Sequence, residues 1–409
     1  MKRSLLTFAL LAILLSPRVF ALTWSEAISL AQKNSHQLIS AQKEVEVAEW
    51  THRKAISAFL PQLSASAGMT ETLNSTNSAT SKSYSYGLSA TQYLFKGTEG
   101  IYGIQNAYAN VEYKKASLRA TRASVLYDLR YAFIHLLYAQ ENVVLSEKIL
   151  KQREQNTRLI QLRYESGKED KGNLMTTQAD EAQAKYDLST AERNLKLSRL
   201  KISQLLQSSV AQVEESGELK APAEPVFDEV METMPSYLMA RKQLEMADLS
   251  QKASISGFLP SLSLSGNYRK KGSEWPPDED SKSWSLNLSY SFFPGGSNIA
   301  ERAIASANLD QAREEFDQSV KDLRYSLEEN FEGFQDALQS LEISNISLAA
   351  AEERAKITNV KYLNGLTGYD EWYRIENAYI QAQKQLLLSR RAALLAEAAW
   401  HKSYGGYVP

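Results

Sequence analysis

Few residues of this 409-residue chain have the types and spacing that catalysis or metal binding requires. The histidines, His36, His52, His135 and His401, stand far apart, and none belongs to an H-E-x-x-H pattern. The chain has no cysteine, which excludes a disulfide framework, a thiolate metal site and a lipid-anchored cysteine. No Ser-His-Asp set or acid–base carboxylate pair can be argued from the spacing. We therefore expect no catalytic, cofactor-binding or metal-binding residues, and no enzyme activity.

Two further patterns have plain structural interpretations. Gly97, Gly100 and Gly103 are spaced as G-x-x-G-x-x-G, but no P-loop lysine follows them, so we interpret them as turn residues at a helix start. His135 follows Phe133 and Ile134 on a long predicted helix, which favours a packed or interfacial histidine.

The first 21 residues have the order of an export signal. Two cations follow Met1, an apolar stretch runs from Leu5 to Leu15, and Val19-Phe20-Ala21 fits a cleavage site. The stretch is shorter than the roughly 20 apolar residues of a membrane-spanning helix. We predict a signal peptide over 1–21, although an amphipathic or buried first helix is an alternative. Removing Lys2, Arg3 and Arg18 with this segment lowers the formal charge of the chain from −2 to −5, which suggests no nucleic-acid partner.

The remaining sequence contains two copies of one unit. Three short motifs of the first copy recur in the second at offsets of 199, 198 and 198 residues: Phe59-Leu60-Pro61 as Phe258-Leu259-Pro260, Phe95-Lys96-Gly97 as Phe293-Pro294-Gly295, and Arg163 to Gly167 as Lys361 to Gly365. Near-constant offsets over a hundred residues indicate duplicated elements of equal length. We place the repeats at about 22–210 and 226–405, with a short linker over 207–226.

Proline positions show where long helices can form, because an interior proline costs about 3 kcal/mol or more. None lies between Pro61 and Pro222 or between Pro294 and Pro409. We predict helices over about 98–166, 173–208, 297–363 and 369–401. A helix of roughly 68 residues is on the order of 100 Å long, which suits a rod that crosses the periplasm.

The apolar residues of these helices follow a seven-residue period, which is typical of supercoiled helix packing. The first copy carries Leu129, Leu136, Val143 and Leu150, and the second carries Leu327, Phe334, Leu341 and Leu348. A soluble coiled-coil scaffold would show the same period.

Between the helices, apolar and small polar residues alternate as in the strands of a membrane barrel. The apolar sets are Leu63, Ala65, Ala67 and Met69; Tyr84, Tyr86, Leu88 and Ala90; Leu262, Leu264, Gly266 and Tyr268; and Trp284, Leu286, Leu288, Tyr290 and Phe292. We expect the last set to face lipid. The polar segments 74–83 and 270–282 are the expected hairpin loops.

Two hairpins supply four strands, whereas the smallest membrane barrels have eight. One chain therefore cannot close a barrel, but three chains supply twelve strands and leave no free edge. The predicted fold class is mainly α, with long coiled-coil-like helices that form an α-helical tube and four strands per chain. A soluble hairpin packed on helices, in a non-transporting periplasmic coiled-coil scaffold protein, is the alternative.

The motifs resemble those of the TolC-like outer membrane efflux family over almost all of the mature chain. Leu22 to Ala27 resembles the first-helix signature, with Ser35 where a proline is usual and Pro235 in the second copy. The junctions at Pro61 and Pro260 match the family's helix-to-strand turns, and Gly97, Gly295 and Gly296 stand at its strand-to-helix turns.

The resemblance implies an outer membrane channel, extending into the periplasm of a Gram-negative cell, for efflux or type I secretion. It implies a homotrimer with a twelve-stranded barrel and a twelve-helix tube, in contact with outer membrane lipid. The partners would be a periplasmic adaptor protein and an inner-membrane pump of the RND, ABC or MFS type. The cargo cannot be read from the sequence.

The resemblance also indicates two sets of residues at the helix turns. Relatives place acids near Glu371 to narrow the periplasmic aperture, with Asp370 beside it and Arg374 where a second acid would be. A solvated helix start explains the same acids equally well. Adaptor contacts are expected at the tips, Gly167 and Gly365-Leu366-Thr367, and better at the second tip, because Lys168 to Gly172 departs from the family pattern.

Overall fold

The computed structural model describes residues 22–73, 80–214 and 219–406. The chain divides into two compact units. The first comprises Met1–Ile39, Thr121–Met231 and Arg324–Pro409, and the second comprises Ser40–Ala120 and Glu232–Leu323. Both halves of the sequence therefore contribute to each unit. The predicted signal peptide, 1–21, lies outside the described residues.

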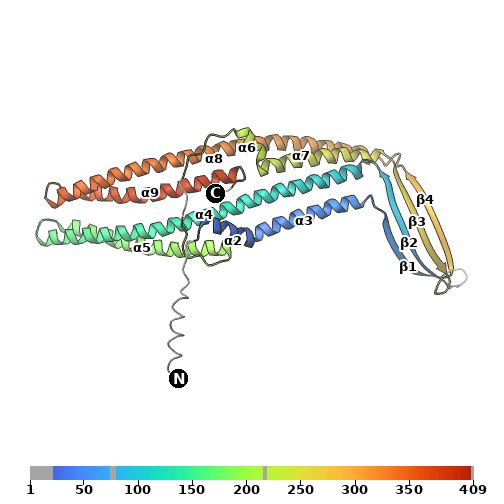
Figure 1. The fold of residues 1–409 in the computed structure, drawn as a ribbon, viewed down its shortest axis with the longest axis horizontal. Helices are drawn as coiled ribbons and strands as arrows, with labels where there is room; N and C mark the ends of the chain where they lie inside the picture. Colours follow the sequence, from blue (N-terminus) through green and yellow to red (C-terminus); the bar gives the residue numbers. More distant parts are fainter. Residues whose placement is uncertain (1–21, 74–79, 215–218, 407–409) are drawn as a thin grey trace, which may run out of the picture. The chain divides into compact units, whose positions relative to one another are not determined.

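Four long helices follow the proline-free windows. Helices α4 (Glu99–Glu165) and α8 (Ser297–Leu363) each have 67 residues, and α5 (Lys171–Leu206) and α9 (Tyr369–Ser403) follow them in sequence. In Figure 1, α5 turns back beside α4, and α9 turns back beside α8. The predicted helices are confirmed, with ends shifted by at most two residues.

Shorter helices complete each half. They are α2 (Trp24–Asn34), α3 (His36–Ser57), α6 (Phe227–Thr233), α7 (Pro235–Ala253) and the 3₁₀ helix η2 (Ser254–Phe258). Thr23 and Glu26 form a capping box at the start of α2. Ser35 separates α2 from α3 without a proline, because its backbone is extended and its Oγ accepts from the Leu38 amide. Departure from the family's usual proline therefore leaves the helix break intact.

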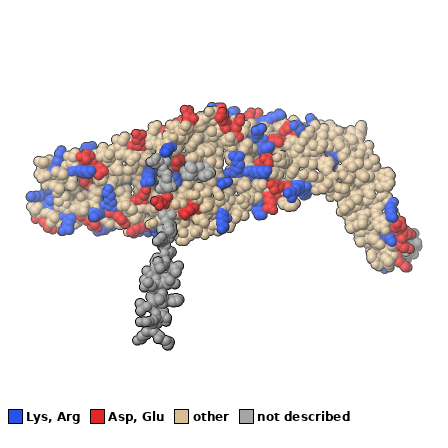
Figure 2. Space-filling model, viewed as in Figure 1, with Lys and Arg blue, Asp and Glu red and all other residues tan. Residues whose placement is uncertain are grey.

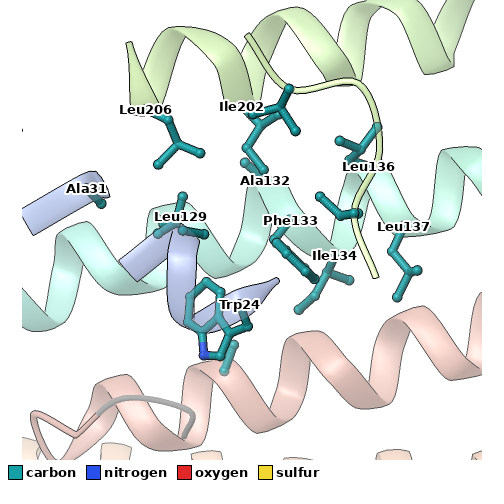
Figure 3. Packing of buried hydrophobic residues seen from close by; sticks show 14 of the residues in the cluster. Trp24, Ala31, Leu129, Ala132, Phe133, Ile134, Leu136, Leu137, Ile202 and Leu206 are labelled. Carbon is teal, nitrogen blue, oxygen red and sulfur yellow. The ribbon is translucent and has the colours of Figure 1, made fainter. Parts of the chain in front are cut away.

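The largest apolar core lies in the first unit, where α2, α4, α5 and α9 meet. Trp24 packs edge-on against Phe133, with ring centroids 5.7 Å apart, and Leu129, Leu136, Ile202 and Leu206 are at most 2% exposed (Figure 3). Residues Val210 and Val213 of the segment after α5 also join this core. Burying each large side chain contributes about 1.5–3 kcal/mol, so this cluster fixes α2 and the ends of α5 and α9 against α4.

The predicted heptad positions differ in burial along the long helices. Leu129, Leu136, Leu327 and Phe334 are buried, whereas Val143, Leu150, Leu341 and Leu348 are only partly buried.

The second unit contains a four-stranded antiparallel sheet in the order β1-β2-β3-β4. The strands are β1 (Gln62–Leu73), β2 (Thr80–Lys96), β3 (Ser261–Gly272) and β4 (Glu279–Ser289), and Figure 1 shows them side by side. Strands β2 and β3 belong to different copies of the repeat, so the sheet joins the two hairpins. Strands β1 and β4 form its edges.

The strand ends differ from the prediction in two places. Residues 80–83, 270–272 and 279–282, predicted as loop, are paired strand residues, because backbone pairing continues beyond the apolar stretch and opposes charges such as Glu71 and Lys82. In contrast, β4 ends at Ser289, so Tyr290 and Phe292 lie outside the strand. Pro294, which has no amide hydrogen, and two left-handed glycines follow closely and end the pairing.

Candidate functional site

The strand register places the alternating sets of the sequence, apart from Tyr290 and Phe292 beyond the end of β4, on one face of the sheet. Ala65 pairs with Leu88, Leu88 with Tyr268, and Leu264 with Leu286. The other face consists mainly of Ser, Thr, Asn and Gln, as in the rows that join Ser64, Ser89, Asn267 and Ser283. A shift between Tyr93 and Phe95 on β2 returns Phe95 to the apolar face, opposite Leu262. The sheet therefore has one apolar and one polar face.

The apolar face is open to solvent in a single chain. Leu63 is 80% exposed, Trp284 78% and Leu288 70%, and Leu286 is exposed beside them. Figure 2 shows few charged side chains over the strands until the hairpin ends, where both signs gather. Exposed apolar surface of this extent indicates contact with lipid or protein.

Aromatic residues and then charges mark the hairpin end of this face. Tyr84, Tyr86 and Tyr268 lie on it, and Trp275 of the loop after β3 packs on Tyr84 and Tyr86. Lys282 then lies 5.7 Å from the Tyr268 ring. Such a change from aliphatic to aromatic to charged side chains is typical of a membrane interface.

The junction residues adopt the backbone conformations that their types favour. Pro61 and Pro260 immediately precede β1 and β3, where a fixed φ suits an extended chain. Gly97, Gly295 and Gly296 have φ values of +62°, +67° and +84°. An added Cβ at Gly97 would also lie 3.0 Å from Cβ of Ser256, so both backbone and packing require glycine there.

The two tips repeat one hydrogen-bonding motif. After α4, the amide of Gly167 donates to the carbonyl of Tyr164, and that of Lys168 to Arg163. After α8, Gly365 donates to Tyr362 and Leu366 to Lys361 in the same pattern. Both glycines are left-handed, with φ of +72° and +73°, as this C-cap requires. The first tip thus ends in an exposed lysine and the second in Leu366, which is 76% exposed, followed by Thr367.

The aperture candidates lie in the first turns of α9. Asp370, Glu371 and Arg374 are all exposed, and the Arg374 guanidinium donates to the Glu371 carboxylate, Nη2 to Oε2, at 2.6 Å. The pair brings opposite charges together where relatives were expected to carry two acids. An aperture role for these residues remains a prediction.

Near Asp370, Glu371 and Arg374, buried aromatic rings pack together between the two tips. Tyr362 stacks on Trp372 with centroids 4.8 Å apart, and Tyr369 contacts the same indole. Glu169 of the first tip accepts from the Tyr362 hydroxyl at 2.5 Å and from Asn173 Nδ2 at 3.0 Å. Burial, followed by the bond to Glu169, raises the pKa of Tyr362 well above its ordinary value. Glu169 of the first tip therefore links the α4–α5 pair to the α8–α9 pair.

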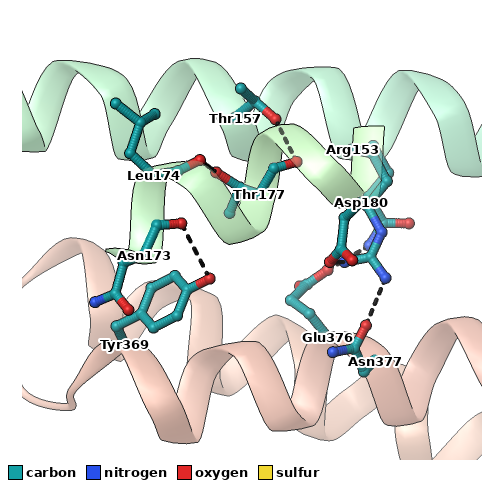
Figure 4. A network of polar contacts seen from close by, with 10 residues as sticks. Arg153, Thr157, Asn173, Leu174, Thr177, Asp180, Tyr369, Glu376 and Asn377 are labelled. Atoms are coloured by element: carbon teal, nitrogen blue, oxygen red, sulfur yellow. Dashed lines mark hydrogen bonds and ion pairs between the residues drawn. The ribbon is translucent and has the colours of Figure 1, made fainter. Parts of the chain in front are cut away.

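A polar network that sequence reasoning missed lies one to two turns further along these helices. Arg153 of α4 pairs with Asp180 of α5, Nη1 to Oδ2, at 3.1 Å, and donates to Asn377 of α9 (Figure 4). Gln152 donates to Glu376, which is 7% exposed. The signal in the sequence was Arg153 and Glu376, two charged residues at helix positions whose neighbours along the same face are mainly apolar.

The histidines are dispersed in the structure, as in the sequence. His135 contacts Tyr131 at 4.3 Å between ring centroids, and His401 contacts Tyr404. Within the described ranges, no three His, Asp or Glu side chains are grouped to hold a metal ion. The helices of those ranges also include none with both the length and the apolar composition to cross a membrane.

Comparison with known proteins gives a consistent result. The profile of the outer membrane efflux protein family matches residues 27–207 and 226–406. Outer membrane protein TolC of Vibrio cholerae is 24% identical over 370 residues, which cover 83% of this chain and 81% of that protein. Outer membrane protein OprJ of Pseudomonas aeruginosa is 23% identical over 390 residues, covering 89% and 78%.

The fold also matches solved channel structures. CusC, whose crystal structures describe folding and transmembrane channel formation, superposes with a TM-score of 0.86 over 94% of this chain and 92% of its own, at 18% identity. The family profile matches both halves of the described sequence, so the match is not limited to one half. The chain therefore belongs to the outer membrane efflux protein family and is a passive outer membrane channel protein extending into the periplasm, not an enzyme.

Proposed function

We propose that three copies of this chain assemble into the exit duct of a tripartite efflux or type I secretion system. The observation that carries the proposal is the sheet: it has free edges at β1 and β4, one apolar face and one polar face. Three such sheets joined edge to edge supply twelve strands, with lipid outside and a hydroxyl-lined lumen inside.

The helices support the same assembly. Helix α8 carries an exposed apolar stripe, Ile343, Ile346, Ile357 and Val360, whose spacing is that of a heptad seam. Helix α5 carries exposed Leu197 and Leu200 on a similar stripe. Neighbouring copies would bury these stripes and close a helical tube.

At the periplasmic end, we propose that the tips contact a periplasmic adaptor, which links the duct to an inner-membrane pump of the RND, ABC or MFS type. Leu366 is the more exposed apolar anchor, whereas the first tip presents Lys168. Adaptor contact should therefore depend more on the second tip than on the first. A transport duct also accounts for the exposed apolar sheet face, which a periplasmic scaffold would leave in water.

The natural absence of cysteine allows a clean test. Ser285→Cys places a thiol on the polar face of β4, and Leu286→Cys places one on the apolar face of the same strand. In planar bilayers, a charged, water-soluble methanethiosulfonate should change the conductance of Ser285→Cys trimers and leave that of Leu286→Cys trimers unchanged. The reverse pattern, or a monomer in mild detergent with intact secondary structure, would show the assembly to be wrong.

A further inference from the structure

A run of three cations, Arg269-Lys270-Lys271, lies near the hairpin end of β3. Because side chains of a strand alternate, Arg269 and Lys271 share one face and Lys270 takes the other. Arg269 pairs with Gly87 and Ser281, which belong to the polar face. Lys270 pairs with Tyr86, which belongs to the apolar face. Two of the three cations therefore project on the polar side of the sheet.

Apart from Glu279 opposite Lys271, the residues beside these two cations are small. The row through Arg269 contains Ser66, Gly87 and Ser281, and the row through Lys271 contains Gly68, Ser85 and Glu279. Both Arg269 and Lys271 are exposed. Long cationic side chains among Ser and Gly therefore extend beyond the rest of the polar face.

Compensating acids are scarce on this face. Among the residues of the four strands, which the structure describes in full, Glu279 is the one carboxylate with the polar-face phase. Glu71 of β1 belongs to the opposite face and lies 3.9 Å from Lys82. An adjoining copy that pairs through its β1 would thus add no acid beside Arg269 or Lys271.

The loop after β3 leaves this face uncovered. Its Trp275 packs on Tyr84 and Tyr86, which lie on the apolar face. An added Cβ at Gly272, in the same phase as Tyr84, would lie 3.0 Å from Cα of Pro277. The loop therefore folds over the lipid side of the sheet.

We propose that Arg269 and Lys271 form a cationic collar inside the extracellular end of the duct, which attracts anionic solutes such as carboxylates and phosphates. The inference rests on the proposed trimer, in which three copies of each residue surround one axis. Three Arg and three Lys against three Glu279 give the collar a net positive charge, and rings of Arg or Lys confer anion preference on pores. The collar is separate from the Glu371–Arg374 pair. In sequence, each hairpin precedes a long helix, α4 or α8, and each tip follows that helix.

The test uses citrate as the anionic probe in planar bilayers at low salt, where screening is weak. We expect citrate in one chamber to block wild-type trimers more strongly than citrate in the other. Arg269→Gln and Lys271→Gln should each weaken the stronger block by roughly three- to tenfold, because each removes three charges from the collar. Glu279→Gln should strengthen it. Lys270→Gln, the neighbouring cation on the lipid face, is the matched control and should behave as wild type.

The outcomes separate this inference from the proposed function. Conducting trimers in which the Arg269→Gln, Lys271→Gln double variant is blocked as strongly as wild type would overturn the collar alone. An equal loss of block in Lys270→Gln would overturn the assigned strand phase and the collar with it. A wild-type chain that forms no channel would remove the proposed function, and the collar would fall for that separate reason.

Discussion

Arg374 donates to Glu371 from one helical turn further along α9, through Nη2 at 2.6 Å and Nε at 3.1 Å to the same oxygen. The two side chains are 62% and 46% exposed, so the pair contributes at most about 1 kcal/mol to stability. Substitutions at either position should therefore leave the fold intact. They should report on the electrostatics of the predicted periplasmic aperture.

The first prediction follows from this pairing. If three copies surround the pore, Arg374→Ala should raise cation preference, because it frees three Glu371 carboxylates from their partners. Glu371→Gln should lower cation preference by leaving three guanidinium groups uncompensated. Reversal potentials in a salt gradient measure both effects, which should shrink at high salt. Asp370→Asn is the nearby control, and unchanged selectivity in both test variants would identify an ordinary solvated helix start.

The second prediction concerns the lipid face. Leu286→Arg or Leu288→Arg should reduce the amount of trimer in outer membrane fractions, because a lipid-facing arginine near the middle of the membrane costs roughly 2–4 kcal/mol. Asn287→Arg introduces the same group between them on the polar face and should be tolerated. Normal membrane levels of all three variants would mean that the face or the membrane assignment is wrong.

A close approach between β2 and β3 yields the third prediction. A Cβ at Gly87 would lie 2.5 Å from the carbonyl oxygen of Tyr268, whereas at Gly68, on the same face, the nearest atom is 4.0 Å away. Gly87→Ala should therefore force the strands apart, at a cost of about 1–3 kcal/mol, and lower the melting temperature of the trimer. Gly68→Ala should melt like wild type. Equal melting of the two variants would indicate that the sheet adapts without strain.

The long helices and the two faces of the sheet could be predicted because proline spacing and alternation act locally. The 198-residue repeat aligned Gly167 with Gly365, and the structure shows both as left-handed C-cap glycines. The ends of the strands were harder to predict, since the pairing of Glu71 with Lys82 depends on a partner strand that a local polarity pattern cannot identify.

Contacts between distant helices were not predictable from the pattern. Arg153 meets Asp180 and Asn377 only because α4, α5 and α9 pack together, and Glu169 reaches Tyr362 from 193 residues away. The sequence showed that Lys168 to Gly172 departs from the family, but it could not show what the departure does. Polar groups that satisfy one another across helices become visible only in the fold.

The contact between Glu169 and Tyr362 leads to the fourth prediction. Glu169→Ala removes the acceptor of the Tyr362 hydroxyl and of Asn173 Nδ2, at a cost of about 1–3 kcal/mol for the unsatisfied hydroxyl. Hydrogen exchange of the backbone amides at the start of α5 should accelerate. Glu165→Ala, an exposed acid at the end of α4, should not change it. Acceleration of equal size in both variants would contradict a specific link through Glu169.

The fifth prediction concerns acid stability. Burial, and then the nearby Arg391 charge, lowers the pKa of His135, and burial followed by Arg130 lowers the pKa of His401. In the unfolded chain each histidine takes up a proton below about pH 6.5, whereas in the folded chain each remains neutral to lower pH. The unfolded state thus binds more protons, and stability falls as pH decreases below that value.

We therefore expect the melting temperature of the trimer to drop between pH 7.5 and pH 5.5, with a smaller drop in His135→Gln and His401→Gln. Arg391→Gln tests the cause at His135, because removing the neighbouring charge should raise the histidine pKa and reduce the drop while the imidazole stays in place. Circular dichroism of wild type and variants across this range measures the effect. An identical pH dependence in all four proteins would show that neither histidine is linked to folding.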